Sequence, residues 1–185
     1  MTDNTTPSGW LKHYYYIRSI VAAVWVVAAF TLGKNDPVTA AVLLVAYPAW
    51  DALANFIDAR RSGGLGSNPS QTFNVIVSAV TAIAVAVALG HGMNAVFAVF
   101  GLWAGLAGVL QLVTGVRRWK AFGAQWAMIL SGAQSALAGI FFFKQSFDAA
   151  VPGIAMFAPY AGFGAFYFLL SAILLTISSR RRAAT

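Results

Sequence analysis

Long apolar runs, separated by short polar segments, dominate the chain. They cover approximately residues 15–33, 38–58, 71–90, 93–115, 123–143 and 150–178. Each is close to the length of about 20 residues that a helix needs to cross a bilayer. Runs such as VTAIAVAVALG lack the alternation of apolar and polar positions that a membrane-barrel strand shows. The pattern therefore predicts an all-α integral membrane protein, with six transmembrane helices in one membrane domain over residues 1–185.

The composition supports this interpretation. Hydrophobic residues make up 59% of the chain and charged residues only 9%, whereas a soluble domain has roughly 25% charged residues. There are too few polar groups to cover a water-facing surface, so the lipid bilayer is the expected partner. The first run lacks a clear small-x-small cleavage site and is expected to be an uncleaved span.

The positive charges fall unevenly on the connections between the runs. Only Lys34 and Lys144 lie in the short turns on one side, while the other ten of the twelve Lys and Arg residues fall on the opposite side. The positive-inside rule makes the basic side cytoplasmic, with both termini inside a bacterial inner membrane. This placement predicts contact with anionic lipid headgroups and argues against nucleic acid as a partner.

The runs form a threefold repeat of helical hairpins, approximately residues 15–61, 71–118 and 123–182. In the second helix of each hairpin, an aromatic residue stands four positions before a small or polar residue. The aromatic residues are Tyr47, Trp103 and Tyr167, and the residues that follow them are Asp51, Ala107 and Ser171. Gly108 comes directly after Ala107. Four residues are one helical turn, so both motif positions share a face.

This repeat resembles the HdeD family of bacterial inner-membrane proteins. The stretch LLVAYPAWDALANFIDARR is similar to a family pattern in which an aromatic residue precedes an aspartate, here Asp51. The chain departs from that pattern with Pro48 and with Ala107 and Ser171 at the aspartate position of the later repeats. The resemblance implies a role in acid or envelope stress tolerance without established catalysis. We also expect a homo-oligomer.

Asp51 is the most unusual residue of the apolar runs. It lies nine residues before Arg60, roughly 13–14 Å along a helix, and so near the middle of a hydrocarbon core about 30 Å thick. An unpaired carboxylate there costs several kcal/mol. Asn55 lies one turn away, and the register of the first hairpin places Arg18 opposite this part of the helix. The alternatives are a structural ion pair and a proton-linked or solute-contacting site.

Nearer the basic side, Asp58, Arg60 and Arg61 are expected to form a separate interfacial charge cluster that includes an ion pair between Asp58 and Arg61. His13 and His91 fall on opposite sides of the membrane, so the sequence predicts neither a metal site nor a cofactor. No residue set predicts an enzyme. Small residues spaced four apart predict close helix packing. These pairs are Gly101 and Gly105, Ala104 and Gly108, Ser135 and Gly139, and Ala158 and Gly162.

Two functions remain open at this point. The first is a non-enzymatic protein of the HdeD type in stress tolerance. The second is a small channel or carrier, for protons or a neutral solute, built around Asp51. A carrier should contain a hydrated cavity that reaches Asp51, whereas a structural protein should bury Asp51 against Arg18.

The charge distribution makes a testable prediction about topology. Reporter fusions after residues 65, 119 and 185 should report the cytoplasm, and fusions after residues 35, 92 and 146 should report the outer side. A fusion after residue 185 that reports the outer side would contradict an even number of spans.

Overall fold

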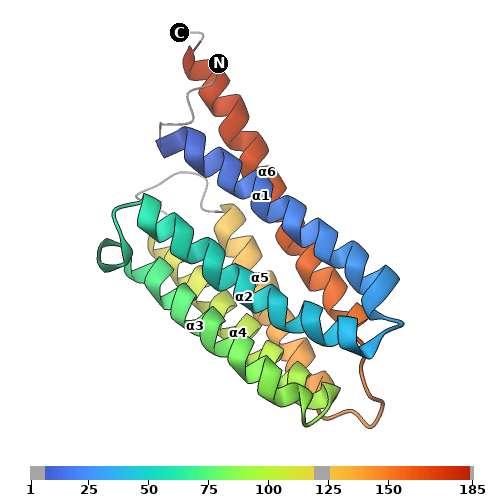
Figure 1. Cartoon of the computed structure of the whole chain (residues 1–185). Helices are drawn as coiled ribbons and strands as arrows, with labels where there is room; N and C mark the ends of the chain where they lie inside the picture. The colour runs from blue at the N-terminus through green and yellow to red at the C-terminus, as the bar shows by residue number, and fades with distance from the viewer. Residues whose placement is uncertain (1–6, 119–125, 184–185) are drawn as a thin grey trace.

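The computed structural model describes residues 7–118 and 126–183, and all regular structure within these residues is helical (Figure 1). The long helices are α1 (Pro7–Ala28), α2 (Pro37–Arg61), α3 (Pro69–Leu89), α4 (Met93–Arg118), α5 (Trp126–Gln145) and α6 (Ala158–Ala183). Three short helices complete the described chain: η1 (Ala29–Gly33), η2 (Leu65–Ser67) and η3 (Ile154–Phe157). The all-α prediction is confirmed for these residues. The start of the third predicted hairpin, residues 123–125, lies outside them.

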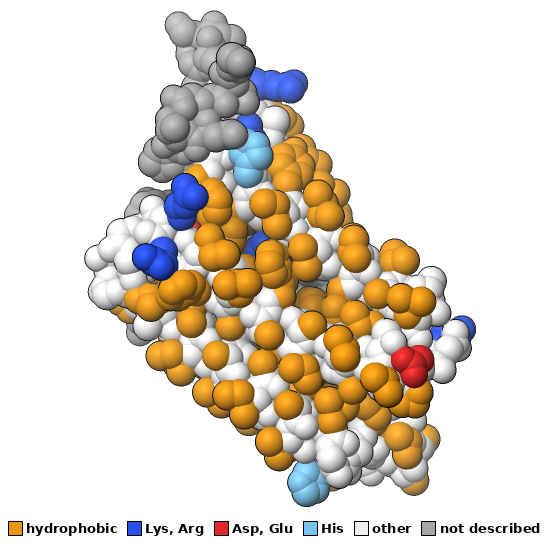
Figure 2. Space-filling model, in the orientation of Figure 1, with side chains coloured by type: hydrophobic (Ala, Val, Ile, Leu, Met, Phe, Trp, Pro, Cys, Tyr) orange, Lys and Arg blue, Asp and Glu red, His pale blue; other side chains and the backbone are white. Residues whose placement is uncertain are grey.

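Most of these helices are suited to cross a membrane. Within the described residues, 5 segments have the required length and hydropathy: Gly9–Gly33, Pro37–Arg61, Pro69–Leu89, Met93–Val113 and Ile154–Ile177. The remaining long helix, α5, begins directly after residues that the structure does not describe. The chain is thus a helical protein with several candidate spans, and the count of six spans stays a prediction. Apolar side chains cover the flank of the helices in Figure 2.

Local sequence signals start the second helix at Pro37. The backbone N–H of Thr39 donates a hydrogen bond of 2.8 Å to Asp36 Oδ2, and the Thr39 hydroxyl donates to the same oxygen. Asp36 is therefore the N-cap, and Pro37 follows at the first helical position. The Thr39 hydroxyl and N–H hydrogen bonds lower the pKa of the exposed Asp36 carboxyl group. The α1–α2 turn is thereby defined by Asp36 and Pro37, which lie between the first two apolar runs.

The helices alternate in direction, so one end of the bundle collects both termini. This basic end contains the first residues of α1, α3 and α5 and the last residues of α2, α4 and α6 (Figure 1). Most Lys and Arg side chains in view in Figure 2 lie toward it. α6 extends beyond the other helices there.

The closest helix pairs are α4–α5, α1–α6 and α2–α3, whereas α1–α2 and α5–α6 touch sparsely. The tightest packing therefore joins neighbouring predicted hairpins, and the two helices within the first or third hairpin pack loosely. Polar links support the α1–α6 pair, because Ser19 Oγ donates a hydrogen bond of 2.9 Å to the carbonyl oxygen of Ala165. The fold thus consists of an α1–α6 pair set against the four helices α2–α5.

Glycines bring α4 and α5 into backbone contact. A Cβ atom placed on Gly101 would lie 2.7 Å from the backbone nitrogen of Phe143, and one on Gly108 would lie 2.7 Å from the carbonyl oxygen of Gly132. Gly139 is equally crowded by α4. Since lipid provides no hydrophobic drive for helix association, such close approach is a main source of attraction between the helices. The predicted packing role is confirmed for these glycines but is wrong for Gly162, which faces open space.

A cluster of phenylalanines closes the bundle near the end opposite the basic end. Phe97 and Phe157 have ring centroids 4.2 Å apart, and Phe100 and Phe157 have centroids 4.4 Å apart. Phe142 of α5 packs on the same Phe157 ring with centroids 4.9 Å apart. All four side chains are at most 2% exposed. They form a tightly packed aromatic layer next to the more polar half of the bundle.

The glycine interface leads to a prediction about stability. Gly108→Ala should lower the free energy of unfolding by about 1–3 kcal/mol, because the methyl group would press on the α5 backbone. Gly162→Ala is the matched control, since its methyl group meets no atom and the substitution gains up to about 1 kcal/mol of helix propensity. Thermal or denaturant unfolding in detergent measures both variants. Equal stability of the two variants would contradict the role of Gly108.

Candidate functional site

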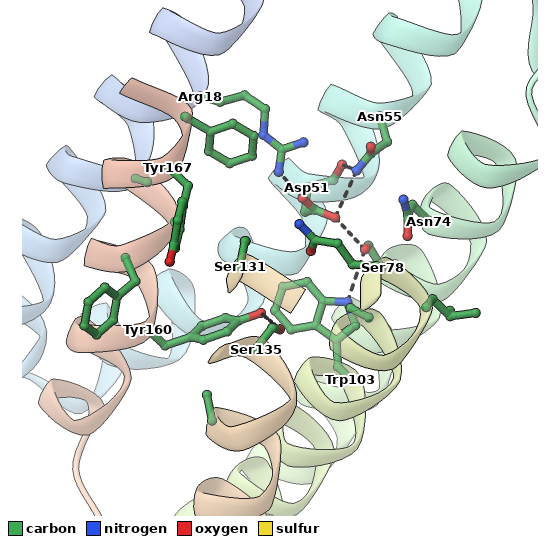
Figure 3. Close-up of a pocket in the computed structure, with 18 of the residues that line it drawn as sticks. Arg18, Asp51, Asn55, Asn74, Ser78, Trp103, Ser131, Ser135, Tyr160 and Tyr167 are labelled. Carbon is green, nitrogen blue, oxygen red and sulfur yellow. Dashed lines mark hydrogen bonds and ion pairs between the residues drawn. The ribbon is translucent and has the colours of Figure 1, made fainter. Parts of the chain in front are cut away.

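A large cavity with both polar and apolar lining residues lies between the α1–α6 pair and helices α2–α5. Its volume is about 1360 Å³, and residues from all six long helices line it. Figure 3 shows side chains from these helices converging around Asp51. The polar and charged residues of its lining include Arg18, Asp51, Asn55, Asp58, Gln71, Asn74, Ser78, Gln111, Ser131, Gln134, Ser135, Tyr160 and Tyr167. The cavity extends to Pro69 and Ser70 at the basic end, and both of these residues are exposed.

Asp51 and Arg18 form an ion pair at the centre of this cavity. Arg18 Nη2 donates to Asp51 Oδ1, and the two side chains are 11% and 21% exposed, respectively. The contact predicted from the hairpin register is therefore confirmed. Asn55 Nδ2 donates a hydrogen bond of 3.0 Å to Asp51 Oδ2. The three predicted residues of the intramembrane polar site thus lie together.

A hydrogen-bonded chain extends this ion pair across the bundle. Ser78 Oγ on α3 donates a hydrogen bond of 2.7 Å to Asp51 Oδ2, and Trp103 Nε1 on α4 donates to Ser78 Oγ at 3.2 Å. On the other side, Arg18 Nη1 donates to the Tyr14 hydroxyl at 3.0 Å. Asp51 therefore accepts hydrogen bonds from Arg18, Asn55 and Ser78, which together neutralise and hold its carboxylate (Figure 3).

Arg18 also contacts α6 through an aromatic ring. Its guanidinium carbon lies 4.3 Å from the centroid of Phe168, which is a favourable cation–π geometry. Arg18 Nε is buried without a hydrogen-bond partner among the described residues. The guanidinium thus binds α1 to both α2 and α6.

Asp58, Arg60 and Arg61 lie at one end of α2, but the predicted ion pair between Asp58 and Arg61 is wrong. Among the described residues, Arg18–Asp51 is the only ion pair. Arg61 lies over the Trp10 ring at 4.7 Å, and Arg60 lies over Phe56 at 5.7 Å. On a helix end at the interface, planar guanidinium groups can stack on aromatic rings while staying hydrated. Asp58 instead turns inward, is 8% exposed and lines the cavity.

The three aromatic residues of the repeat motif, Tyr47, Trp103 and Tyr167, all line the same cavity. Tyr47 and Trp103 meet edge to face, with centroids 6.1 Å apart. Ala107 also lines the cavity, whereas Gly108 faces α5 and Ser171 is not part of the lining. The repeat therefore brings its aromatic residues to one site, whereas its small residues lie in different surroundings.

Sequence reasoning missed several lining residues. Gln71, Asn74 and Ser78 lie at spacings of three and four on α3, so they form one polar stripe on a helical face. Ser131 and Gln134 give α5 a similar stripe. The signal that could have found them is this periodicity of polar residues within apolar helices.

The described residues contain no group of three or more His, Cys, Asp or Glu side chains that could hold a metal ion. The arrangement is suited to reversible binding through hydrogen bonds, charge and aromatic contact.

The ion pair leads to a prediction about stability. Asp51→Asn should lower the free energy of unfolding by about 3 kcal/mol, because it leaves the Arg18 charge buried without its partner. Arg18→Gln combined with Asp51→Asn should recover part of the loss. Unfolding of the single and double variants in detergent measures the coupling, with the exposed Asp36→Asn as the control. Strictly additive losses in the double variant would argue against direct coupling.

Comparison with known proteins gives one partial match. Residues 75–144 match the sequence model of a short repeat of unknown function (DUF308), the family to which HdeD belongs. The match covers most of α3, all of α4 and nearly all of α5. No curated protein and no solved structure matches the chain. This region is thus similar to a repeat found in HdeD, and the apolar helices accord with a membrane protein.

Proposed function

We propose that this chain is a non-enzymatic, carrier-type membrane protein that binds a ligand with a polar group in the cavity around Asp51. The observation that carries the proposal is the cavity itself. It reaches Asp51 and presents amide, hydroxyl and aromatic groups between helices whose outer surfaces are apolar. Polar groups at this depth are costly unless they are satisfied, and they mark binding sites or solute pathways in membrane proteins.

Amides that have no partner among the described residues give the strongest support. The side chains of Asn74, Gln111 and Gln134 line the cavity, and none makes a hydrogen bond with any described residue. An amide removed from water without a partner costs several kcal/mol on an alkane reference scale. Water or a ligand must therefore satisfy these groups. A purely structural site would pair them with one another.

The ion pair favours ligand binding over a proton relay at Asp51. Its carboxylate already accepts hydrogen bonds from Arg18, Asn55 and Ser78. These contacts occupy both carboxylate oxygens and tie Asp51 of α2 to α1 and α3. In the proposed function, Asp51 therefore holds the walls of the cavity in place, and the unsatisfied amides contact the ligand.

A second candidate is a role in acid or envelope stress tolerance. The match of residues 75–144 to the repeat family that includes HdeD favours it. In this proposal the chain lies in a bacterial inner membrane with both termini in the cytoplasm, contacts anionic lipid headgroups through its basic end and forms a homo-oligomer. Ligand binding and stress tolerance are compatible, because a protective membrane protein can act by binding a solute.

The proposed function predicts that water reaches the cavity. The chain has no cysteine, so Ser131→Cys provides a unique thiol in the cavity wall. A positively charged, membrane-impermeant methanethiosulfonate reagent added at the basic side should modify this thiol. Mass spectrometry of the intact protein in vesicles measures the modification.

Leu102→Cys is the matched control, since Leu102 is 61% exposed on the outer surface and is not part of the cavity lining. Its thiol should face lipid and react at least about tenfold more slowly, because the charged reagent must leave water. A Ser131→Cys thiol that is as unreactive as this control would refute a hydrated binding cavity.

A further inference from the structure

The sparse contacts at α1–α2 and α5–α6 leave two seams beside the cavity, and the two seams differ. Along α1–α2, Arg61 lies over Trp10, Arg18 pairs with Asp51, and Trp25 Nε1 donates a 2.7 Å hydrogen bond to the Leu43 carbonyl oxygen. These contacts are distributed from the basic end towards the opposite end. The α1–α2 seam is therefore closed.

The α5–α6 seam is closed at one level only. Tyr160 of α6 contacts the Ser135 hydroxyl at 3.3 Å and packs against Phe142, with ring centroids 5.8 Å apart. Between Tyr160 and the basic end, no hydrogen bond or ring contact joins described residues of α5 to those of α6. Apart from the Tyr160 contacts, the two helices touch only sparsely.

Apolar side chains border the α5–α6 seam at the level of Tyr160 and towards the end opposite the basic end. Leu137 and Phe141 on α5, and Pro159 and Phe163 on α6, line the cavity and are exposed on the outer surface. A second groove of about 420 Å³ on the outside of α6 shares Pro159 and Phe163 with the cavity. The cavity therefore continues through an apolar opening onto the surface that faces lipid.

Charge at the opposite side of the cavity complements a cation. The lining contains two carboxylates, Asp51 and Asp58, and one guanidinium group, Arg18, among the described residues. Arg18 neutralises Asp51, which leaves Asp58 in excess. The only side-chain hydrogen bond of Asp58 to a described residue comes from Gln71 Nε2 at 3.5 Å. A carboxylate that is 8% exposed and so weakly satisfied favours a cationic partner.

The aromatic surroundings of Asp58 suit an ammonium group. Tyr14 and Tyr15 line the cavity together with Asp58, and their ring centroids are 5.6 Å apart. Aromatic side chains are the usual setting in which proteins bind quaternary ammonium groups, and Asp58 adds a negative charge to the same lining.

We propose that the ligand is a membrane amphiphile, with an ammonium-bearing head at Asp58 and an alkyl chain in the α5–α6 opening, through which it enters from the bilayer. This inference rests on the proposed function and identifies the ligand class of the same cavity. The depths of Asp58 and of the α5–α6 opening agree with this placement of head and chain. Asp58 lies near the basic end of α2, whereas Phe163 and Pro159 lie 5 and 9 residues deeper than Phe168, the neighbour of Arg18. That is about 8–14 Å along the helix. The ammonium head of the ligand would therefore lie near the basic end and its alkyl chain deeper in the bundle, as for a lipid in one leaflet of a bilayer.

Protection of the Ser131→Cys thiol tests this proposal. The protein in nanodiscs is treated with N-ethylmaleimide in the presence of decyltrimethylammonium, which has both the cationic head and the chain. This compound should slow the modification, because it fills the cavity. Tetramethylammonium has the head alone, and decyl sulfate has the same chain with an anionic head. Neither should protect the thiol at the same concentration.

Substitution of Asp58 locates the head. Asp58→Asn should raise the half-protecting concentration of decyltrimethylammonium by about tenfold, because a hydrogen-bonded charge interaction is lost. Asp36→Asn, which removes an exposed carboxylate in the α1–α2 turn, should leave it unchanged. Modification without any amphiphile serves as the folding check for each variant.

Three outcomes would overturn the inference. Equal protection by tetramethylammonium would show a water-soluble cation site and remove the need for lateral entry, while the proposed function would stand. Equal protection by decyl sulfate, or an unchanged half-protecting concentration in Asp58→Asn, would show that the chain binds without recognition of its head. A Ser131→Cys thiol that does not react at all would instead refute the proposed function itself.

Discussion

The ion pair between Arg18 and Asp51 is the interaction on which the arrangement of this bundle depends. Both groups lie in helices whose surroundings are apolar, and neither charge is tolerable there without the other. Asp51 also binds Ser78 of α3, which in turn accepts a hydrogen bond from Trp103 of α4. Since α1 touches α2 only sparsely, this network is a main link between the α1–α6 pair and the other four helices, beside the contacts of Trp25 and Tyr160.

The remaining helices are held together by a different physical effect. Gly101, Gly108 and Gly139 allow the backbones of α4 and α5 to meet so closely that a Cβ atom at any of them would clash with the facing backbone. In lipid, such van der Waals contact replaces the hydrophobic effect that drives packing in water. One side of the molecule is therefore tightly packed, while the other is joined by directional polar contacts that leave space between the helices.

This contrast explains why the cavity forms where it does. Phe97, Phe100, Phe142 and Phe157 fill the bundle towards the end opposite the basic end. Above them, polar side chains on α3, α4 and α5 replace the rings, and their amides need hydration or a ligand. The apolar border at the α5–α6 opening then gives the cavity two kinds of wall, one suited to a polar group and one suited to a hydrocarbon chain.

Several features followed from the sequence alone because they depend on local pattern. The all-helical structure and the position of the basic residues are set by hydropathy and charge spacing. The pairing of Arg18 with Asp51 could also be predicted, because antiparallel helices joined by a short turn have a determined register. The tertiary structure alone decided the rest: which helices pack most closely, that Asp58 turns into the cavity while Arg60 and Arg61 lie over aromatic rings, and that the polar stripes of α3 and α5 face one space. These outcomes depend on the rotation of each helix about its own axis, which is set by the sum of weak contacts with all its neighbours and so cannot be deduced from any one segment.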